Sequence, residues 1–334
     1  MATHSSLMLR EPAIGPDIWP DIGPDPFLAD VLQGLAQQPK VVPARWLYDD
    51  NGSALFEAIT RLPEYYPTRV ESGILTQSAQ AIADAVGAGR AVVEFGAGSA
   101  AKTPLVLDAI SPAAYVALDI SGDFLRDACA RLQQRYPHLP ITALEADFMH
   151  STALPASVAG LPKLGFFPGS TIGNLAPSAA VDLLRAMRAT LGDGAMLLIG
   201  MDRVKPAEVL TRAYDDAAGI TSAFNLNLAA RINRELHGTI ALDALRHRAV
   251  WNADLSRIEM HLEATRAIHF EVAGRAFAMA EGETVHTENS HKYEPASATT
   301  LLIAGGWTPV ARFTDADERF MVIVAEAQPP KLEP

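Results

Sequence analysis

Cysteine, positive charge and long apolar runs are all scarce in this chain. Its one cysteine, Cys129, excludes a disulfide within the chain, and an amphipathic pattern around it predicts a buried apolar side chain. The net charge is −12, from 27 basic and 39 acidic residues, which argues against binding nucleic acid through its phosphates. No apolar run reaches the ~20 residues of a membrane helix, and the N-terminus lacks the pattern of a secretory signal. We therefore expect a cytoplasmic protein without nucleic-acid or membrane partners.

Apolar segments are plentiful, since 49% of the 334 residues are hydrophobic, enough for a large core and two lobes. Strands are predicted at 91–95, 115–120, 141–146, 164–169 and 195–201, and helices at 101–110, 122–135 and 177–190. Strands that alternate with amphipathic helices indicate a parallel sheet covered on both faces. Two later strands, 307–313 and 320–325, are expected as an antiparallel pair at the edge of that sheet.

The segments outside this sheet are less regular. Residues 1–26 are rich in proline, glycine and aspartate and are expected to form a tail or a surface strap. Ser53 is expected to cap a helix that ends before Pro63, and residues 70–86 are expected to form one helix. Residues 206–236 are predicted to be mostly helical and 249–287 to be mostly strands.

A glycine turn follows the first predicted strand, in the order Glu94-Phe-Gly96-Ala-Gly98. Glycines at such a turn let a ligand approach the backbone, and the next helix directs free N–H groups toward it. Nucleotide-like cofactors bind there in doubly wound folds, beyond the carboxyl ends of the strands. The residues at the other strand ends therefore indicate which cofactor is bound.

Acidic side chains end the next two strands. Asp119 is suited to accept hydrogen bonds from ribose hydroxyls, and the pair Asp147-Phe148 can recognise and stack on an adenine ring. A nicotinamide dinucleotide and S-adenosylmethionine both fit a glycine turn followed by a ribose-binding acid. Glu94, Asp147-Phe148 and the expected antiparallel edge pair favour S-adenosylmethionine. Lys102, at the start of the following helix, is placed to neutralise the cofactor's carboxylate.

Five blocks of sequence together resemble the L-histidine Nα-methyltransferases of ergothioneine biosynthesis. The resemblance covers residues 39–326 and is specific, because four blocks lie outside the generic methyltransferase core. The blocks are Trp46–Arg69 with its Glu64-Tyr-Tyr-Pro67, Val93–Gly98, Phe167-Pro-Gly-Ser-Thr-Ile-Gly-Asn174, Tyr214–Thr221 and Thr287-Glu-Asn-Ser-His-Lys-Tyr293.

The resemblance implies a Rossmann-like class I methyltransferase domain with a smaller α+β substrate domain. Residues 70–202 and 293–334 would bind S-adenosylmethionine, and residues 1–69 and 203–292 would bind the substrate. The implied reaction is trimethylation of the α-amine of histidine to hercynine, with no metal. We expect the protein to be a monomer.

The resemblance also implies roles for individual residues. Around the amino acid's backbone end it places Tyr48, Tyr65, Gly169, Asn174 and Tyr214, of which Tyr48, Tyr65 and Asn174 are the candidate catalytic residues. Around the side chain it places Met260, Glu288 and Ser290, the last two holding the imidazole. The cofactor would be held by Glu94, Gly96, Gly98, Lys102, Asp119, Asp147 and Phe148. Whether Tyr65 or Tyr66 faces the substrate stays open.

Four alternatives remain, one of which is a non-catalytic binding module with a degenerate cofactor site. The same fold could methylate tryptophan or tyrosine, although Glu288 and Ser290 are better suited to imidazole. A nicotinamide-dependent oxidoreductase fits the glycine turn. A metal site at His286, Glu288 and His291 is disfavoured, because their spacing matches no metal motif.

Overall fold

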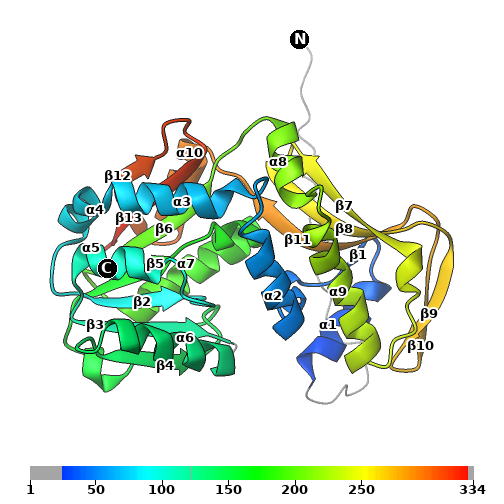
Figure 1. Cartoon of the computed structure of the whole chain (residues 1–334), viewed down its shortest axis with the longest axis horizontal. Helices are drawn as coiled ribbons and strands as arrows, with labels where there is room; N and C mark the ends of the chain where they lie inside the picture. Colours follow the sequence, from blue (N-terminus) through cyan, green and yellow to red (C-terminus); the bar gives the residue numbers. More distant parts are fainter. Residues whose placement is uncertain (1–24, 121, 330–334) are drawn as a thin grey trace, which may run out of the picture.

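The computed structural model describes residues 25–120 and 122–329, so the proline-rich segment 1–26 lies almost wholly outside the described residues. The strands form a seven-stranded sheet, a four-stranded sheet and a two-stranded ribbon, and the two larger sheets lie at opposite ends of the molecule (Figure 1). No helix in this part of the chain is long and apolar enough to cross a membrane.

The larger sheet confirms the predicted Rossmann-like class I methyltransferase architecture. Its strand order is β12-β13-β6-β5-β2-β3-β4, and all neighbours are parallel except β13, which runs antiparallel to β6 and β12. The bounds are β2 (Ala91–Phe95), β3 (Ala114–Asp119), β4 (Ile141–Glu145), β5 (Lys163–Phe167), β6 (Met196–Asp202), β12 (Trp307–Thr314) and β13 (Phe320–Ala327).

Helices cover both faces of this sheet, which explains why all five residues of β2 are buried. One face packs against α3 (Tyr66–Gln77), α4 (Ala79–Val86), α5 (Thr103–Ile110) and α6 (Gly122–Arg135). The other face packs against α7 (Pro177–Leu191) and α10 (Pro295–Ala304). Alternate residues of β2 join different clusters: Val92 meets the first helix layer, and Val93 meets the second.

The four-stranded sheet has the order β1-β11-β8-β7 and a hydrophobic cluster of its own. Its strands are β1 (Lys40–Val41), β7 (Leu245–Asn252), β8 (Arg257–Ala264) and β11 (Thr284–His291), with the ribbon β9 (Ile268–Val272) and β10 (Arg275–Met279). The cluster also takes residues from α1 (Pro26–Ala36), α2 (Asp50–Ile59), α8 (Ala207–Tyr214) and α9 (Ile220–Glu235).

Two of the chain segments that connect the sheets run together. One leaves β6 at Asp202 toward α8, and the other leaves β11 toward α10. They touch where the backbone N–H of Tyr293 donates to the carbonyl of Asp202, 2.8 Å away. The carboxyl edge of the large sheet is thereby fixed beside β11.

Two local predictions were wrong. The predicted cap Ser53 lies inside α2, because the carboxylate of Asp49 accepts from the Gly52 N–H at 2.7 Å and starts the helix earlier. The single helix predicted over 70–86 is two helices, α3 and α4, which meet at Ser78, and α3 already begins at Tyr66 with Pro67 in its first turn.

Candidate active site

One cavity of about 760 Å³ collects side chains from both sheets. It is lined at one end by the residues that follow β2, β3, β4 and β5, and at the other by residues of β8 and β11. Every predicted site residue lines it: Tyr48, Tyr65, Glu94, Gly96, Gly98, Lys102, Asp119, Asp147, Phe148, Gly169, Asn174, Tyr214, Met260, Glu288 and Ser290. Segments far apart in the sequence thus meet at a single site.

The glycine turn adopts a backbone that favours glycine at both positions. Gly96 has φ +69° and Gly98 has φ +51°. A Cβ atom on Gly96 would lie 3.3 Å from the Phe148 ring, whereas one on Gly98 would meet no protein atom within 4 Å among the described residues. The backbone at Gly98 is therefore open to a ligand that enters the cavity.

The two strand-end acids both accept hydrogen bonds from backbone N–H groups. Asp119 accepts a hydrogen bond from the Gly98 N–H at 2.9 Å, which ties the end of β3 to the turn. Asp147 accepts from the Met149 N–H at 2.9 Å. The ring of Phe148 packs edge-on against Phe167, with centroids 6.0 Å apart. An acid and an aromatic face thus flank the same stretch of cavity.

Glu94 and Lys102, which were also predicted to hold the cofactor, have side-chain partners within the protein. The Glu94 carboxylate is buried and accepts from Thr103 Oγ1 at 2.6 Å and Tyr115 OH at 2.7 Å. Burial raises its pKa to about 7. Lys102 forms an ion pair with Glu71. Both residues border the cavity, yet their charged groups already have partners.

Glu288 is the most perturbed acid at the other end of the cavity. Its Oε1 accepts from Tyr48 OH and from Asn174 Nδ2, each at 3.3 Å. Burial raises its pKa to about 7, against the opposing effects of the Tyr48 hydrogen bond and the Lys292 charge. Among the described residues both donors reach Oε1 and neither reaches Oε2.

Sheet geometry explains how Glu288 meets its neighbours. Glu288 pairs with Met260 across β11 and β8, so Met260 forms the cavity wall beside it. A Cβ on Gly173 would lie 2.8 Å from the carbonyl oxygen of His291. Only glycine permits that approach, which brings Asn174, at the end of the short 3₁₀ helix η3 (Thr171–Asn174), beside β11.

Tyr214 and Ser290 form a buried hydroxyl pair whose oxygens are 2.6 Å apart. Tyr214 ends α8, and Ser290 lies two residues beyond Glu288 on β11, on the same side of the strand. Burial raises the pKa of Tyr214 well above that of an ordinary phenol, so both groups stay protonated hydroxyls.

The choice between Tyr65 and Tyr66 follows from their contacts. Tyr65 lines the cavity and packs edge-on against Tyr214, with centroids 6.0 Å apart. Tyr66 points elsewhere and donates to Asp202 Oδ2 at 2.6 Å. Tyr65 is therefore the one of the two that can face a ligand in this cavity.

No group of three His, Cys, Asp or Glu side chains within 25–120 and 122–329 is placed to hold a metal ion. His286, Glu288 and His291 therefore do not form the metal site considered above. The ring of His286 instead stacks on His261, with centroids 4.8 Å apart.

Two buried charges beside the cavity were missed from the sequence. Lys292 donates to both Ser290 and Tyr214, at 2.8 and 2.9 Å. Glu71 accepts from the Gly169 N–H at 2.9 Å and pairs with Lys102. Lys292 lies within the family block Thr287–Tyr293, so the sequence offered it as a candidate. Glu71 carried no local signal, because its partners are distant in the sequence.

Comparisons with known proteins agree with this geometry. A family model described as histidine-specific methyltransferase, SAM-dependent, matches residues 27–327, where SAM is S-adenosylmethionine. The histidine N-alpha-methyltransferase of Mycolicibacterium smegmatis is 43% identical, and that of Mycobacterium tuberculosis 40%, each over 86% of this chain and 90% of its own length. Ergothioneine biosynthesis protein 1 of Neurospora crassa is 27% identical over 87% of this chain and 34% of that protein. This chain belongs to the SAM-dependent, histidine-specific methyltransferases.

Proposed function

We propose that this chain transfers three methyl groups in succession from SAM to the α-amine of L-histidine, giving hercynine for ergothioneine biosynthesis. The observation that carries the proposal is the placement of Glu288 and Ser290, a carboxylate and a hydroxyl, in the cavity that also contains the Gly96–Gly98 turn. The names of the mycobacterial relatives support α-amine methylation, and that of the fungal relative supports the pathway.

The residues at the glycine turn fit SAM. The open backbone at Gly98 suits the methionine part, and Asp119 suits the ribose. Asp147 and Phe148 suit the adenine. When bound, SAM supplies an electrophilic methyl group on a sulfonium centre. Because Lys102 is paired with Glu71, we propose that it shares its charge between that carboxylate and the cofactor's.

Glu288 and Ser290 would hold the imidazole. Glu288 Oε1 is occupied by Tyr48 and Asn174, so Oε2 would accept the ring N–H. Ser290 would bond the other ring nitrogen. Met260 would pack against the ring. An indole or a phenol would leave one member of the polar pair unsatisfied, which disfavours tryptophan and tyrosine as substrates.

The amine must be neutral to attack the methyl group. Tyr48 and Tyr65 have pKa values raised well above that of an ordinary phenol by burial, so they offer neutral hydroxyl groups. Hydroxyl and amide oxygens accept from a neutral amine without holding it as ammonium. Asn174 and Gly169 complete that end of the cavity. Positioning of the amine supplies much of the acceleration.

The proposal also assigns a role to each part of the chain. Residues 70–202 and 293–334 would bind SAM, and 1–69 and 203–292 would bind histidine. The separate hydrophobic clusters of the two sheets support this division. We further propose that the enzyme acts as a monomer in the cytoplasm.

Mass spectrometry tests the reaction. The enzyme is incubated with SAM and an equimolar mixture of histidine, tryptophan and tyrosine. We expect histidine to gain one, two and then three CH₂ increments, with fragmentation placing all of them on the α-nitrogen. Methyl groups on the ring, or on the other two amino acids, would contradict the proposal.

A further inference from the structure

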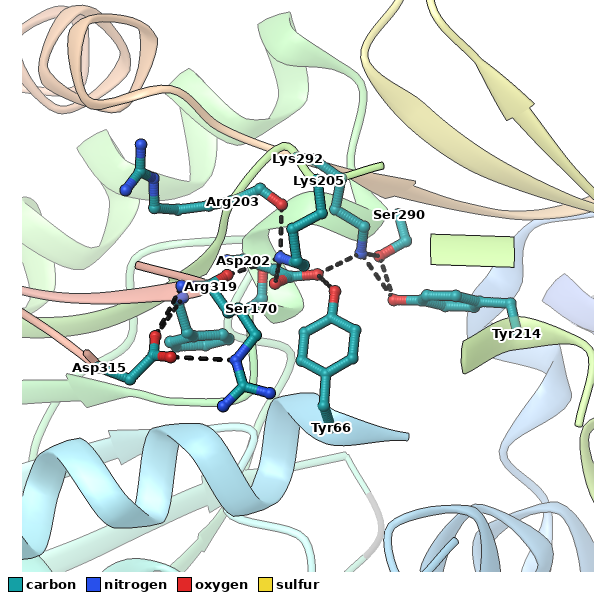
Figure 2. A network of polar contacts seen from close by, with 11 residues as sticks. Tyr66, Ser170, Asp202, Arg203, Lys205, Tyr214, Ser290, Lys292, Asp315 and Arg319 are labelled. Atoms are coloured by element: carbon teal, nitrogen blue, oxygen red, sulfur yellow. Dashed lines mark hydrogen bonds and ion pairs between the residues drawn. The ribbon is translucent and has the colours of Figure 1, made fainter. Parts of the chain in front are cut away.

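Lys292 is a fully buried cation directly behind the Ser290–Tyr214 pair. Its side chain has 0% exposure. Its Nζ lies 2.8 Å from Ser290 Oγ, 2.9 Å from Tyr214 OH and 2.9 Å from Asp202 Oδ2 (Figure 2). An ammonium has three N–H donors and no acceptor, so each donor has one partner. Lys292 does not line the cavity and therefore acts through the two hydroxyl groups.

The anchor of Lys292 is itself fixed. Asp202 also accepts from Lys205 Nζ and from Tyr66 OH, each at 2.6 Å (Figure 2). Its backbone N–H donates to Ser170 Oγ at 2.9 Å. The Asp202 carboxylate is thus held from three sides, and it holds the ammonium of Lys292 in one place.

The ammonium constrains the two hydroxyl groups. Each hydroxyl has one proton and two lone pairs, and one lone pair of each faces Lys292. Because the two oxygens are 2.6 Å apart, one hydroxyl donates to the other. If Tyr214 donates, both lone pairs of Ser290 are used and its own O–H points toward the cavity. If Ser290 donates, Tyr214 presents the O–H instead.

The charge on Lys292 decides which arrangement suits the substrate. A bond from an ammonium polarises a hydroxyl and makes it a better donor. A protonated imidazole beside Ser290 would be repelled by the positive charge of Lys292. An imidazole nitrogen without a proton would instead accept a hydrogen bond from the Ser290 O–H that points into the cavity. The arrangement in which Tyr214 donates to Ser290 is therefore the one that matches a neutral imidazole.

We propose that Lys292 is a positioning residue that directs the Ser290 proton to the unprotonated ring nitrogen of histidine, so that the site selects the neutral tautomer whose N–H meets Glu288. This inference rests on the proposed imidazole site.

The test compares histidine with a pyrrole analogue that keeps the ring N–H but has C–H in place of the unprotonated nitrogen. Binding of both is measured by calorimetry with S-adenosylhomocysteine present, and turnover is measured with SAM. The preference is the ratio of the Kd of the pyrrole analogue to the Kd of histidine. Lys292→Met should reduce this ratio by about tenfold. It should raise KM for histidine with little change in kcat, and leave the Kd of S-adenosylhomocysteine within about twofold. An unchanged preference would overturn the proposal.

Two controls separate positioning from loss of structure. Tyr66→Phe removes a different partner of Asp202 without touching Ser290 or Tyr214, and should keep the wild-type preference. In a Ser290→Ala background, Lys292→Met should have little further effect, because the two residues act through one bond. An equal effect in both backgrounds would refute the mechanism.

If Lys292→Met does not fold, Lys292→Gln serves instead, since it keeps N–H donors without the charge. The preference should then fall by at least about threefold, and an unchanged value counts against the proposal. Wild-type product analysis is done first. If the wild type does not methylate the α-amine of histidine, the proposed function is rejected. The calorimetric comparison of histidine with the pyrrole analogue still tests the role of Lys292.

Discussion

At the scale of single residues, burial sets the chemistry of the acids. Glu94 and Glu288 both have pKa values raised to about 7, chiefly by burial. Glu94 accepts two hydroxyl groups on one oxygen and braces the strand that carries the glycine turn. Glu288 accepts two weaker, longer bonds and borders the cavity. Glu94 is thus held by protein hydroxyl groups, whereas Glu288 keeps a carboxylate oxygen for a ligand in the cavity.

The raised pKa of Glu288 predicts how stability changes with pH. An acid whose pKa is higher in the folded than in the unfolded state favours folding below its unfolded pKa, and that stability is lost as pH rises through the folded pKa. Glu288→Gln mimics the protonated form at every pH. We expect it to be more stable than the wild type at pH 8, by an amount on the order of 3 kcal/mol.

Chemical denaturation at pH 5 and pH 8 measures this difference. The gap between Glu288→Gln and the wild type should be small at pH 5 and grow toward pH 8. The control Glu208→Gln replaces an exposed residue of α8. Its stability should differ from that of the wild type by the same small amount at pH 5 and at pH 8. A gap that shrinks as pH rises would contradict the cause assigned to the pKa shift.

At the scale of elements, the glycine turn after β2 depends on backbone geometry as well as on space. Gly96 and Gly98 share a positive φ, yet within residues 25–120 and 122–329 only Gly96 has a neighbour, the Phe148 ring, in the direction of a Cβ. These two glycines therefore allow strain and crowding to be separated experimentally.

Alanine substitutions make that separation. Gly98→Ala should lower the free energy of unfolding by about 1 kcal/mol, from the positive φ alone. Gly96→Ala should lower it by roughly 1 kcal/mol more, because its Cβ also presses on Phe148. Urea denaturation without ligand measures both. Equal losses would mean that the Phe148 ring moves freely out of the way.

At the scale of the whole molecule, Asp202 connects the two sheets electrostatically. It receives Tyr66 from α3, Lys205 from the segment toward α8, and Lys292 from the segment after β11. Burial lowers the pKa of Lys205 to about 8, although the Asp202 charge opposes this. One carboxylate thus compensates two buried ammonium groups at the junction.

Asp202→Asn should therefore be strongly destabilising. It removes the negative charge and leaves two buried cations uncompensated, which typically costs about 3–5 kcal/mol. Asp182→Asn, which removes an exposed ion pair with Arg185, should change stability by less than about 0.5 kcal/mol. Urea denaturation followed by both fluorescence and circular dichroism measures the loss. Near-equal stability of the two variants would refute the role given to Asp202.

Local sequence determined the framework of this protein. Apolar runs of strand length between amphipathic helices specify a parallel sheet, because a strand buried on both faces must be apolar throughout. The carboxyl ends of parallel strands meet at one edge of the sheet, so the residues at those ends can be expected to share a site. Gly96, Asp119 and Asp147 were found in this way. The resemblance of the family blocks supplied Asn174, Tyr214, Glu288 and Ser290, and the structure places all of them on one cavity.

Tertiary structure alone decided which polar groups pair with one another. The pairing of Lys102 with Glu71, the engagement of Glu94 by Thr103 and Tyr115, and the attachment of Lys292 to Asp202 join residues without any local pattern. Even the N-terminal cap of α2, Asp49, depends in part on Asn227, which donates to the same carboxylate oxygen at 2.7 Å. Periodicity specifies which face of an element is buried, because burial depends on local spacing. A hydrogen bond between distant residues depends on how whole elements pack, and that packing appears only when the chain has folded.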